Sequence, residues 1–408
     1  MRNKTSGKKI LKYVLYLNLF AVFFVSFGLA GRYPYNYLNV ALWLFLGILY
    51  FLLRRVEHIK LLKFRYDIFV IAMAVYCLAM FLSYVLSGFL NFSKVGIVCA
   101  LSGLMIYWIL SDGLISRKAM LFCACAGAAA FLALFAFVYR SDILHPSFAK
   151  RIGDFFNNQN EIALNLAFCM ILLFGMAVEA KKWWLKAAGF SLSFLSFYFI
   201  LLTGSVSAAL TSAIVFLVSI PFCFKKHRLV VVSIEISVAI MGAIAIFLLP
   251  SFSYFAERIR GMLASFGLGQ GSGDGSFESR LLSIIVGLRV FLENPLFGAG
   301  NEAVLRCFSI TAHNNFAQVL ANYGIFAFLA HESVMLLPLA KLKKSDEPHK
   351  KLVLPLLLFL FIFQFFLFTF NSKPGSILIA VSFYLMYPNG CYTTSLRRAS
   401  IRYTKINI

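Results

Sequence analysis

Residues 162–178 read IALNLAFCMILLFGMAV, an apolar run without a charge between Glu161 and Glu179. A helix needs about 20 predominantly apolar residues, within a range of about 17–25, to cross the hydrocarbon core of a bilayer. Lipid offers no hydrogen-bond partner to bare backbone groups, so a run that crosses it must be helical. This stretch therefore predicts a transmembrane helix.

Comparable runs recur along the chain, which is 61% hydrophobic and only 13% charged, whereas soluble domains are about 25% charged. We therefore expect an all-α polytopic membrane protein with about 12 transmembrane helices, in which residues 1–408 form a single integral membrane domain. The predicted spans are 13–31, 37–53, 67–87, 93–111, 119–138, 161–179, 187–202, 205–224, 229–249, 315–340, 352–370 and 375–388.

The net charge of +22 does not indicate a nucleic-acid partner, because the basic residues lie in short loops between spans. The N- and C-terminal segments and alternate loops hold 27 of the 38 Lys and Arg residues. The positive-inside rule therefore predicts that both termini are cytoplasmic. Residues 250–314 then form a large extracytoplasmic loop and residues 139–160 a smaller one. The first apolar run has no clear small-residue cleavage site, so we expect it to stay as a signal anchor.

The stretch 249–320 is the one long polar interruption of the chain. Apolar residues at spacings of three and four over 252–266 predict a short amphipathic helix, which either lies in the membrane interface or packs on neighbouring spans. A glycine-rich turn follows at 267–275. Residues 279–292 then read as a second short helix, ended by Asn294-Pro295.

Two arginines of this second helix are separated by nine residues, so they point to opposite faces at about 100° per residue. Arg289 is placed to pair with Glu293 one turn later, as an ordinary surface pair. Arg280 stands at the start of the helix beside the glycine turn, and we take it as the candidate catalytic arginine. The alternative is a contact with lipid headgroups or solvent.

His313 precedes the tenth predicted span, and only it and His145 among the six histidines fall in outward loops. Asn314, Gln318 and Asn322 follow at steps of four, so their amides line one stripe of the helix. An outward histidine at the mouth of such a stripe suits a base or a phosphate contact. The amides are candidate substrate-binding groups, and interhelical hydrogen bonding is the alternative.

The smaller outer loop ends in a run of polar residues before the sixth span. Asn160 is a candidate N-cap of that span. The exposed N–H groups of a helix start, with Arg151 nearby, form a candidate anion site. A plain helix cap beside headgroup-binding basic residues remains the alternative.

Several motifs are absent from the sequence: a Walker A loop, Asp-x-Asp, His-Glu-x-x-His and Cys-x-x-Cys. We therefore expect no metal, no nucleotide donor and no cofactor. The eight cysteines fall mostly within apolar spans, where a thiol is a small hydrophobe, so they do not indicate a disulfide framework.

Taken together, residues 150–330 resemble the O-antigen ligase and polymerase family of bacterial surface-polysaccharide membrane transferases. The segments that carry the resemblance are Arg151-x-Gly153 with Asn157–Asn160, Leu202-Thr203-Gly204-Ser205, Arg280, Asn294-Pro295-Leu296-Phe297-Gly298-Ala299-Gly300, and His313-Asn314 with nine residues before Gly324. The chain departs from the family pattern at Val206, where many members carry arginine.

The resemblance implies transfer of an oligosaccharide from undecaprenyl diphosphate to an acceptor hydroxyl on the outer face of the bacterial cytoplasmic membrane, in surface polysaccharide or lipopolysaccharide biosynthesis. The acceptor is another lipid-linked glycan for a polymerase, or lipid A core for a ligase. His313 and Arg280 would be catalytic. The substrate-binding residues would be Arg151, Asn160, Asn314, Gln318 and Asn322.

Two other classes of function compete with this reading. A transporter or flippase would show inverted repeats and broken helices near the middle of the membrane, and the sequence shows no repeat. A non-catalytic assembly protein would tolerate changes at Arg280 and His313. Within the spans, the only well-embedded ionisable residues are Glu235, His331 and Glu332, which we interpret as lying close to the cytoplasmic interface.

Overall fold

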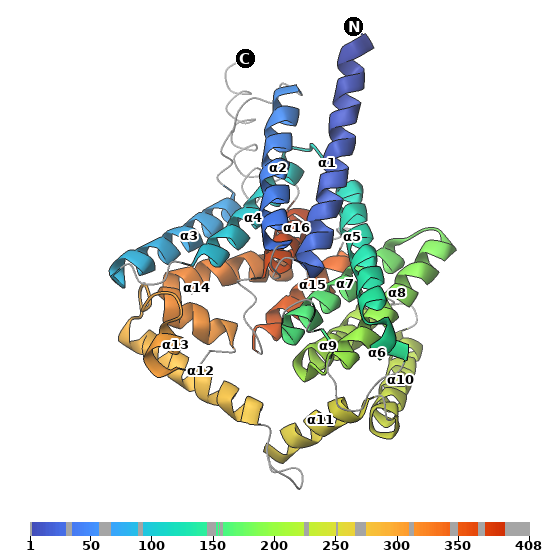
Figure 1. Cartoon of the computed structure of the whole chain (residues 1–408), viewed down its shortest axis with the longest axis vertical. Coiled ribbons are helices and arrows are strands. Elements are labelled where there is room, and N and C mark those ends of the chain that lie inside the picture. Colours follow the sequence, from blue (N-terminus) through green and yellow to red (C-terminus); the bar gives the residue numbers. More distant parts are fainter. Residues whose placement is uncertain are drawn as a thin grey trace, which may run out of the picture.

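The structure is a computed structural model that describes residues 2–29, 35–56, 67–88, 93–144, 152–153, 155, 158–223, 228–249, 252–265, 275–309, 314–342, 350–365 and 372–387. The elements of this part of the chain are all helices (Figure 1). They are α1 (Arg2–Gly28), α2 (Tyr35–Val56), α3 (Ile68–Leu86), α4 (Lys94–Ser111), α5 (Arg117–Val138), α6 (Arg140–Leu144), α7 (Gln159–Glu179), α8 (Trp183–Leu202), α9 (Val206–Cys223), α10 (Arg228–Leu248), α11 (Ser253–Ser265), α12 (Gly275–Glu293), α13 (Ala303–Phe308), α14 (Asn315–Leu342), α15 (Lys350–Phe363) and α16 (Lys373–Met386).

An all-helical membrane protein is confirmed, but the predicted count of about 12 spans is not. Across the described ranges, nine helices are long and apolar enough to cross a membrane. A tenth arises if the two segments Ile240–Leu248 and Ser253–Ser265, bent by 107°, count as one broken span. The other two predicted spans correspond to α15 and α16, each of 14 residues. Helices of this length extend about 21 Å, less than the roughly 30 Å of a bilayer core.

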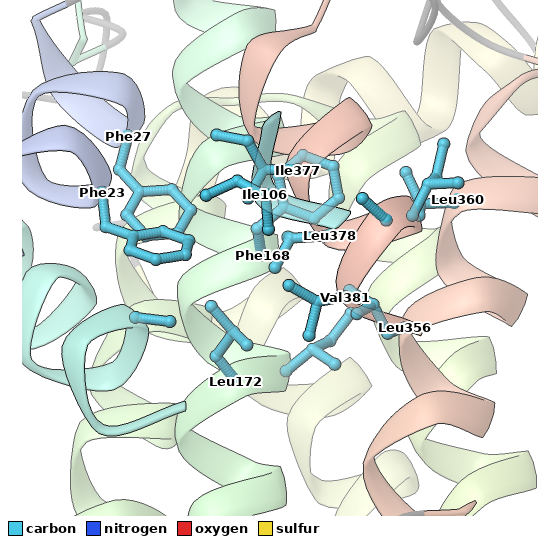
Figure 2. Close-up of a cluster of buried hydrophobic side chains, with 14 of the residues drawn as sticks. Phe23, Phe27, Ile106, Phe168, Leu172, Leu356, Leu360, Ile377, Leu378 and Val381 are labelled. Carbon is cyan, nitrogen blue, oxygen red and sulfur yellow. The ribbon is translucent and has the colours of Figure 1, made fainter. Parts of the chain in front are cut away.

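Helix α7 is the centre of the core. Its side chains are buried on nearly every face, including Ala163, Phe168 and Ile171 with no exposed surface. Figure 2 shows Phe168 and Leu172 of α7 among side chains from α1, α4, α15 and α16. A helix that is apolar all round is one that other helices surround, and the uncharged run 162–178 meets that requirement.

Small residues let α8 lie close against α7. A Cβ added to Gly189 would lie 2.8 Å from the Cβ of Ala177. Further along the same face, Ser193 Oγ donates to Met170 O (3.0 Å) and Ser196 Oγ donates to Leu166 O (2.7 Å). Small side chains that bring two backbones together, with hydroxyls bonding across, are the usual means of helix association in membranes.

The N-cap of α7 is Asn158 rather than Asn160. The Asn158 side chain accepts from Asn160 N (2.9 Å), and Asn160 lies within the first turn. The prediction of Asn160 as the cap was therefore wrong by two positions. An amide can cap from any position where the chain is still extended, and the run Asn157–Asn160 offers several.

The long polar stretch contains helices where they were predicted. Helix α11 matches the amphipathic helix and α12 matches the second short helix, while the short α13 was not predicted. In Figure 1, α11 and α12 lie at the end of the molecule opposite to the start of α1. Helix α12 packs along α14, and α11 contacts α9 and α10.

Helix α14 is two arms rather than one straight helix. Gly324 has φ 76° and ψ −172°, which are not helical values. We call residues 315–323 the first arm and residues 325–342 the second arm. Phe316 and Phe328 are 12 residues apart, about 18 Å along a straight helix, yet their ring centroids are 6.0 Å apart. The first arm therefore folds back beside the second.

Candidate active site

Five helix ends gather in one layer of the bundle. Helix α15 runs antiparallel to α7, because Gly175 faces Leu352 and the rings of Phe168 and Phe359 are 5.6 Å apart. Helix α8 is antiparallel to α7, and α9 packs along α15 with its C-terminal Cys223 at Lys351. We call this layer the motif end. It comprises the starts of α7, α9 and α14 and the ends of α8 and α15.

The smaller outer loop meets the turn between α8 and α9 at the motif end. Ile152 N donates to Leu202 O (3.3 Å), and Gly153 adopts φ +120° against Gln159. Thr203 and Ser205 are both buried in the turn, where Ser205 N donates to Thr203 Oγ1 (3.3 Å). Two segments that are about 50 residues apart in the chain, around Gly153 and Thr203, are therefore neighbours.

The start of α14 is fixed to the end of α15. Asn315 N donates to Gln364 O (2.8 Å), and Asn315 Nδ2 donates to Gln364 Oε1. Asn314 caps the first arm by accepting from Ala317 N (2.9 Å), and its Nδ2 donates to Phe365 O (3.2 Å). Sequence reasoning missed Gln364, for which the available signal was one amide within an otherwise apolar run.

Helix α12 runs parallel to the first arm, and Arg280 belongs to the face of α12 that packs against it. Gly287 faces Ala317, where an added Cβ would lie 3.0 Å from the Cβ of Ala317. Towards the C-terminal ends, Val290 shares a buried cluster with Ala321. Ser283 is fully buried one turn before Gly287. Arg280, seven residues before Gly287, lies on the same face and about 10 Å nearer the motif end.

The two arginines of α12 differ as predicted. Arg280 is half-buried on the packed side of the helix, and Ser283 Oγ donates to its carbonyl (2.7 Å). Arg289 is 71% exposed, and its Nε lies 3.5 Å from Glu293 Oε1. The surface pair between Arg289 and Glu293 is thus confirmed, and Arg280 is the arginine that α12 turns toward the bundle.

The loop 294–300 is interlocked with the break in α14. Ala299 N donates to Ala321 O (2.8 Å), Gly300 N donates to Asn322 O (3.1 Å) and Ile325 N donates to Pro295 O (2.9 Å). Gly298 lies against the backbone of Asn322, and Gly324 lies against the carbonyl of Leu296. Because Gly298 and Gly324 have no side chains, the backbone of the loop can touch the backbone of α14. This contact holds the first arm in place.

The amide stripe lies on the first arm, and two of its three members bond to the protein. Asn314 bonds to the end of α15, as described above, and Asn322 Oδ1 accepts from Ala303 N (3.1 Å) at the start of α13. These bonds agree with interhelical hydrogen bonding, the alternative to substrate binding for the amides. Gln318 is buried, and its Oε1 has no hydrogen-bond partner within the described part of the chain. Gln318 is therefore the amide of the stripe whose side-chain oxygen is left without a hydrogen bond from the described residues.

Two of the predicted site residues, His313 and Arg151, lie outside the described residues. His313 directly precedes Asn314, the cap of the first arm, and Arg151 directly precedes Ile152. Asn160 is half-buried in the first turn of α7 at the motif end. Of the predicted set, the structure brings Asn160, Asn314 and Gln318 into the motif-end layer, and it directs Arg280 along α12 toward that layer.

Comparison with known proteins identifies the region that holds these residues. A model of the O-antigen ligase family matches residues 191–331, from within α8 to the second arm of α14. A search of curated proteins gave no match. The matched region includes the α8–α9 turn, Arg280, the loop 294–300 and the break at Gly324. Residues 191–331 therefore form an O-antigen ligase domain, and this domain supports the resemblance of the chain to the O-antigen ligase and polymerase family.

Proposed function

We propose that this protein transfers an oligosaccharide from undecaprenyl diphosphate to an acceptor hydroxyl on the outer face of the bacterial cytoplasmic membrane. The single observation that carries the proposal is the arrangement of the O-antigen ligase domain. In this domain the start of α14 and the α8–α9 turn lie in one layer with the start of α7. Arg280 lies on the face of α12 that packs against α14, at the end of α12 nearer to that layer. The acceptor is a second lipid-linked glycan or a lipid A core.

In the proposed reaction, the acceptor oxygen bonds to the anomeric carbon while the bond from that carbon to the diphosphate oxygen breaks. Negative charge develops on the departing diphosphate, where cations and N–H donors stabilise it. Arg280 and Arg151 supply the guanidinium groups, and the exposed N–H groups at the start of α7 supply further donors. His313 accepts the proton of the hydroxyl, and Gln318 and Asn160 hold the sugar. The reaction uses no metal, nucleotide or cofactor.

Arg280→Lys is expected to lower transfer nearly as much as Arg280→Ala. A guanidinium grips two phosphate oxygens through parallel hydrogen bonds, whereas an ammonium is a point charge. Charge-assisted hydrogen bonds contribute about 1.5–3 kcal/mol, so we expect a loss of roughly 10- to 100-fold in kcat/KM. The measurement is sugar transfer by the purified protein in detergent. Arg289→Ala is the matched control, because Arg289 lies on the exposed face of the same helix. Full activity of Arg280→Lys would contradict bidentate binding.

The proposed reaction can take place on the outer face of the membrane only if the chain has the predicted orientation. The charge bias predicts that Gly271 is extracytoplasmic and Lys344 cytoplasmic. In a cysteine-free background, a membrane-impermeant thiol reagent added to intact cells is expected to label Gly271→Cys and not Lys344→Cys. Labelling of both positions after the cells are opened is the control. The reverse pattern in intact cells would place the site in the cytoplasm and overturn the proposed reaction.

A further inference from the structure

A buried set of polar side chains connects the start of α14 to its second arm. Beyond the Asn315–Gln364 bonds, Gln364 Nε2 donates to Glu332 Oε2 (3.4 Å), and Glu332 Oε1 lies 3.0 Å from His331 Nδ1. Asn315 and Gln364 have no exposed surface, and His331 and Glu332 are 4% and 5% exposed. We call Asn315, Gln364, Glu332 and His331 the Glu332 network.

The network exists because α14 folds back at Gly324. Asn315 and Glu332 are 17 residues apart, about 25 Å along a straight helix, yet both bond to the side chain of Gln364. Glu332 lies eight residues after Gly324 and nine before Lys341, near the middle of the second arm. Glu332 therefore lies well inside the second arm rather than at its end.

A carboxyl group within a membrane protein requires compensation. Ionisable side chains inside a membrane are costly, and they face the interior of the bundle where they find partners. The partners of Glu332 come from three places: His331 beside it, Gln364 at the end of α15, and Asn315 through Gln364. Polar networks whose members are all bonded specify a unique arrangement of the helices that carry them. The arrangement specified here is the depth and direction of the first arm.

The first arm begins at the cap Asn314, immediately after His313. Movement at Asn315 therefore moves Asn314, which the chain joins directly to His313, the residue proposed to activate the acceptor. We propose that Glu332 is a positioning residue, which acts through Gln364 on Asn315 and sets the position of Asn314 and the first arm at the motif end. This inference rests on the proposed function. Glu332 and Gln364 lie outside the region that the family model matches.

The test is a double-mutant cycle with Glu332→Met, Gln364→Met and the double variant, each unbranched and of similar size to the residue it replaces. Each single change is expected to lower kcat roughly 10- to 100-fold, the effect of a displacement of about 1 Å at a reacting group. The donor KM is expected to change little. Because both changes cut the same link, the double variant is expected to be no worse than the worse single variant. Glu332→Gln keeps the bond to Gln364, so it is expected to retain most of the parental kcat that Glu332→Met loses.

The control is Tyr50→Phe, which removes a hydroxyl that donates to Asp112 Oδ2 (2.6 Å) in a separate, partly buried cluster between α2 and the C-cap of α4. The substrate for the assay is lipid-linked oligosaccharide extracted from the membranes of the source organism. Equal loss of kcat in Tyr50→Phe, losses that multiply in the double variant, or parental kcat in Glu332→Met would overturn the proposal.

Hydrogen exchange separates failure of this inference from failure of the proposed function. Amides of the first arm, residues 315–323, are expected to lose protection in both Met variants and to keep it in Tyr50→Phe. This measurement of hydrogen exchange needs no substrate. If the parental protein transfers no sugar, the proposed function fails, and exchange still decides the role of Glu332. Unchanged protection of the first arm in both Met variants would show that the network does not hold it.

Discussion

Gly324→Ala is expected to destabilise the protein by more than about 3 kcal/mol, through backbone strain combined with a steric clash. The backbone at φ 76° and ψ −172° lies in a region that only glycine enters readily. A Cβ at this position would also meet the carbonyl of Leu296 and the amide nitrogen of Phe297. Both groups belong to backbone that cannot turn aside as a flexible side chain would. The loop 294–300 and the break must therefore separate.

The matched control for this prediction is Gly88→Ala. Gly88 has the same φ of +76°, but an added Cβ would meet nothing within 4 Å. The control therefore carries the strain of a positive φ, about 1–2 kcal/mol, without the clash. The measurement is thermal unfolding of both purified variants in one detergent, with yield of folded protein as a second reading. Equal losses in the two variants would mean that the contact between Gly324 and Leu296 does not hold the arms of α14 together.

The helical spans could be predicted because their causes are local. A run of apolar residues must be helical in lipid wherever it stands, and charges mark its ends. Thus the predicted span 93–111 corresponds to α4, Lys94–Ser111, and the span 119–138 to α5, Arg117–Val138. The pair of Arg289 with Glu293 was predictable for the same reason, because it depends only on the spacing of the two residues along one helix.

The fold-back of α14 depends on contacts that no local pattern contains. A glycine within an apolar run is compatible with a straight helix. What bends the helix at Gly324 is the backbone of residues 294–300, which bonds to both sides of the break. The link from Asn315 to Gln364 likewise joins residues that are distant in the chain. The predicted stripe of three amides held as a helical face, but it lies on a short arm that turns back rather than on a full span.

The arrangement of the first arm also explains why one histidine is expected to dominate the rate. Only two histidines fall in loops that are predicted to face outward, and of these only His313 adjoins a helix start that is fixed by hydrogen bonds to the end of α15. A base contributes to catalysis only when it is held within hydrogen-bond reach of the hydroxyl. Asn314, which caps the first arm and bonds to Phe365 O, fixes the chain directly after His313.

His313→Ala is accordingly expected to lower the rate of sugar transfer by about 10²- to 10⁴-fold, the range for loss of a general base. Binding of the lipid-linked donor is expected to change little, because the residues proposed to hold the diphosphate are Arg280 and Arg151. The assay is single-turnover transfer in detergent, with protein amount and thermal stability matched. His145, the other histidine that is predicted to face outward, provides the control, and His145→Ala is expected to transfer at the parental rate. His313→Gln keeps a hydrogen bond without titrating, so substantial activity in Gln but not in Ala would assign positioning rather than proton removal. Transfer at the parental rate by His313→Ala would leave the histidine as part of the chain that leads into α14, and the base would have to be sought elsewhere at the motif end.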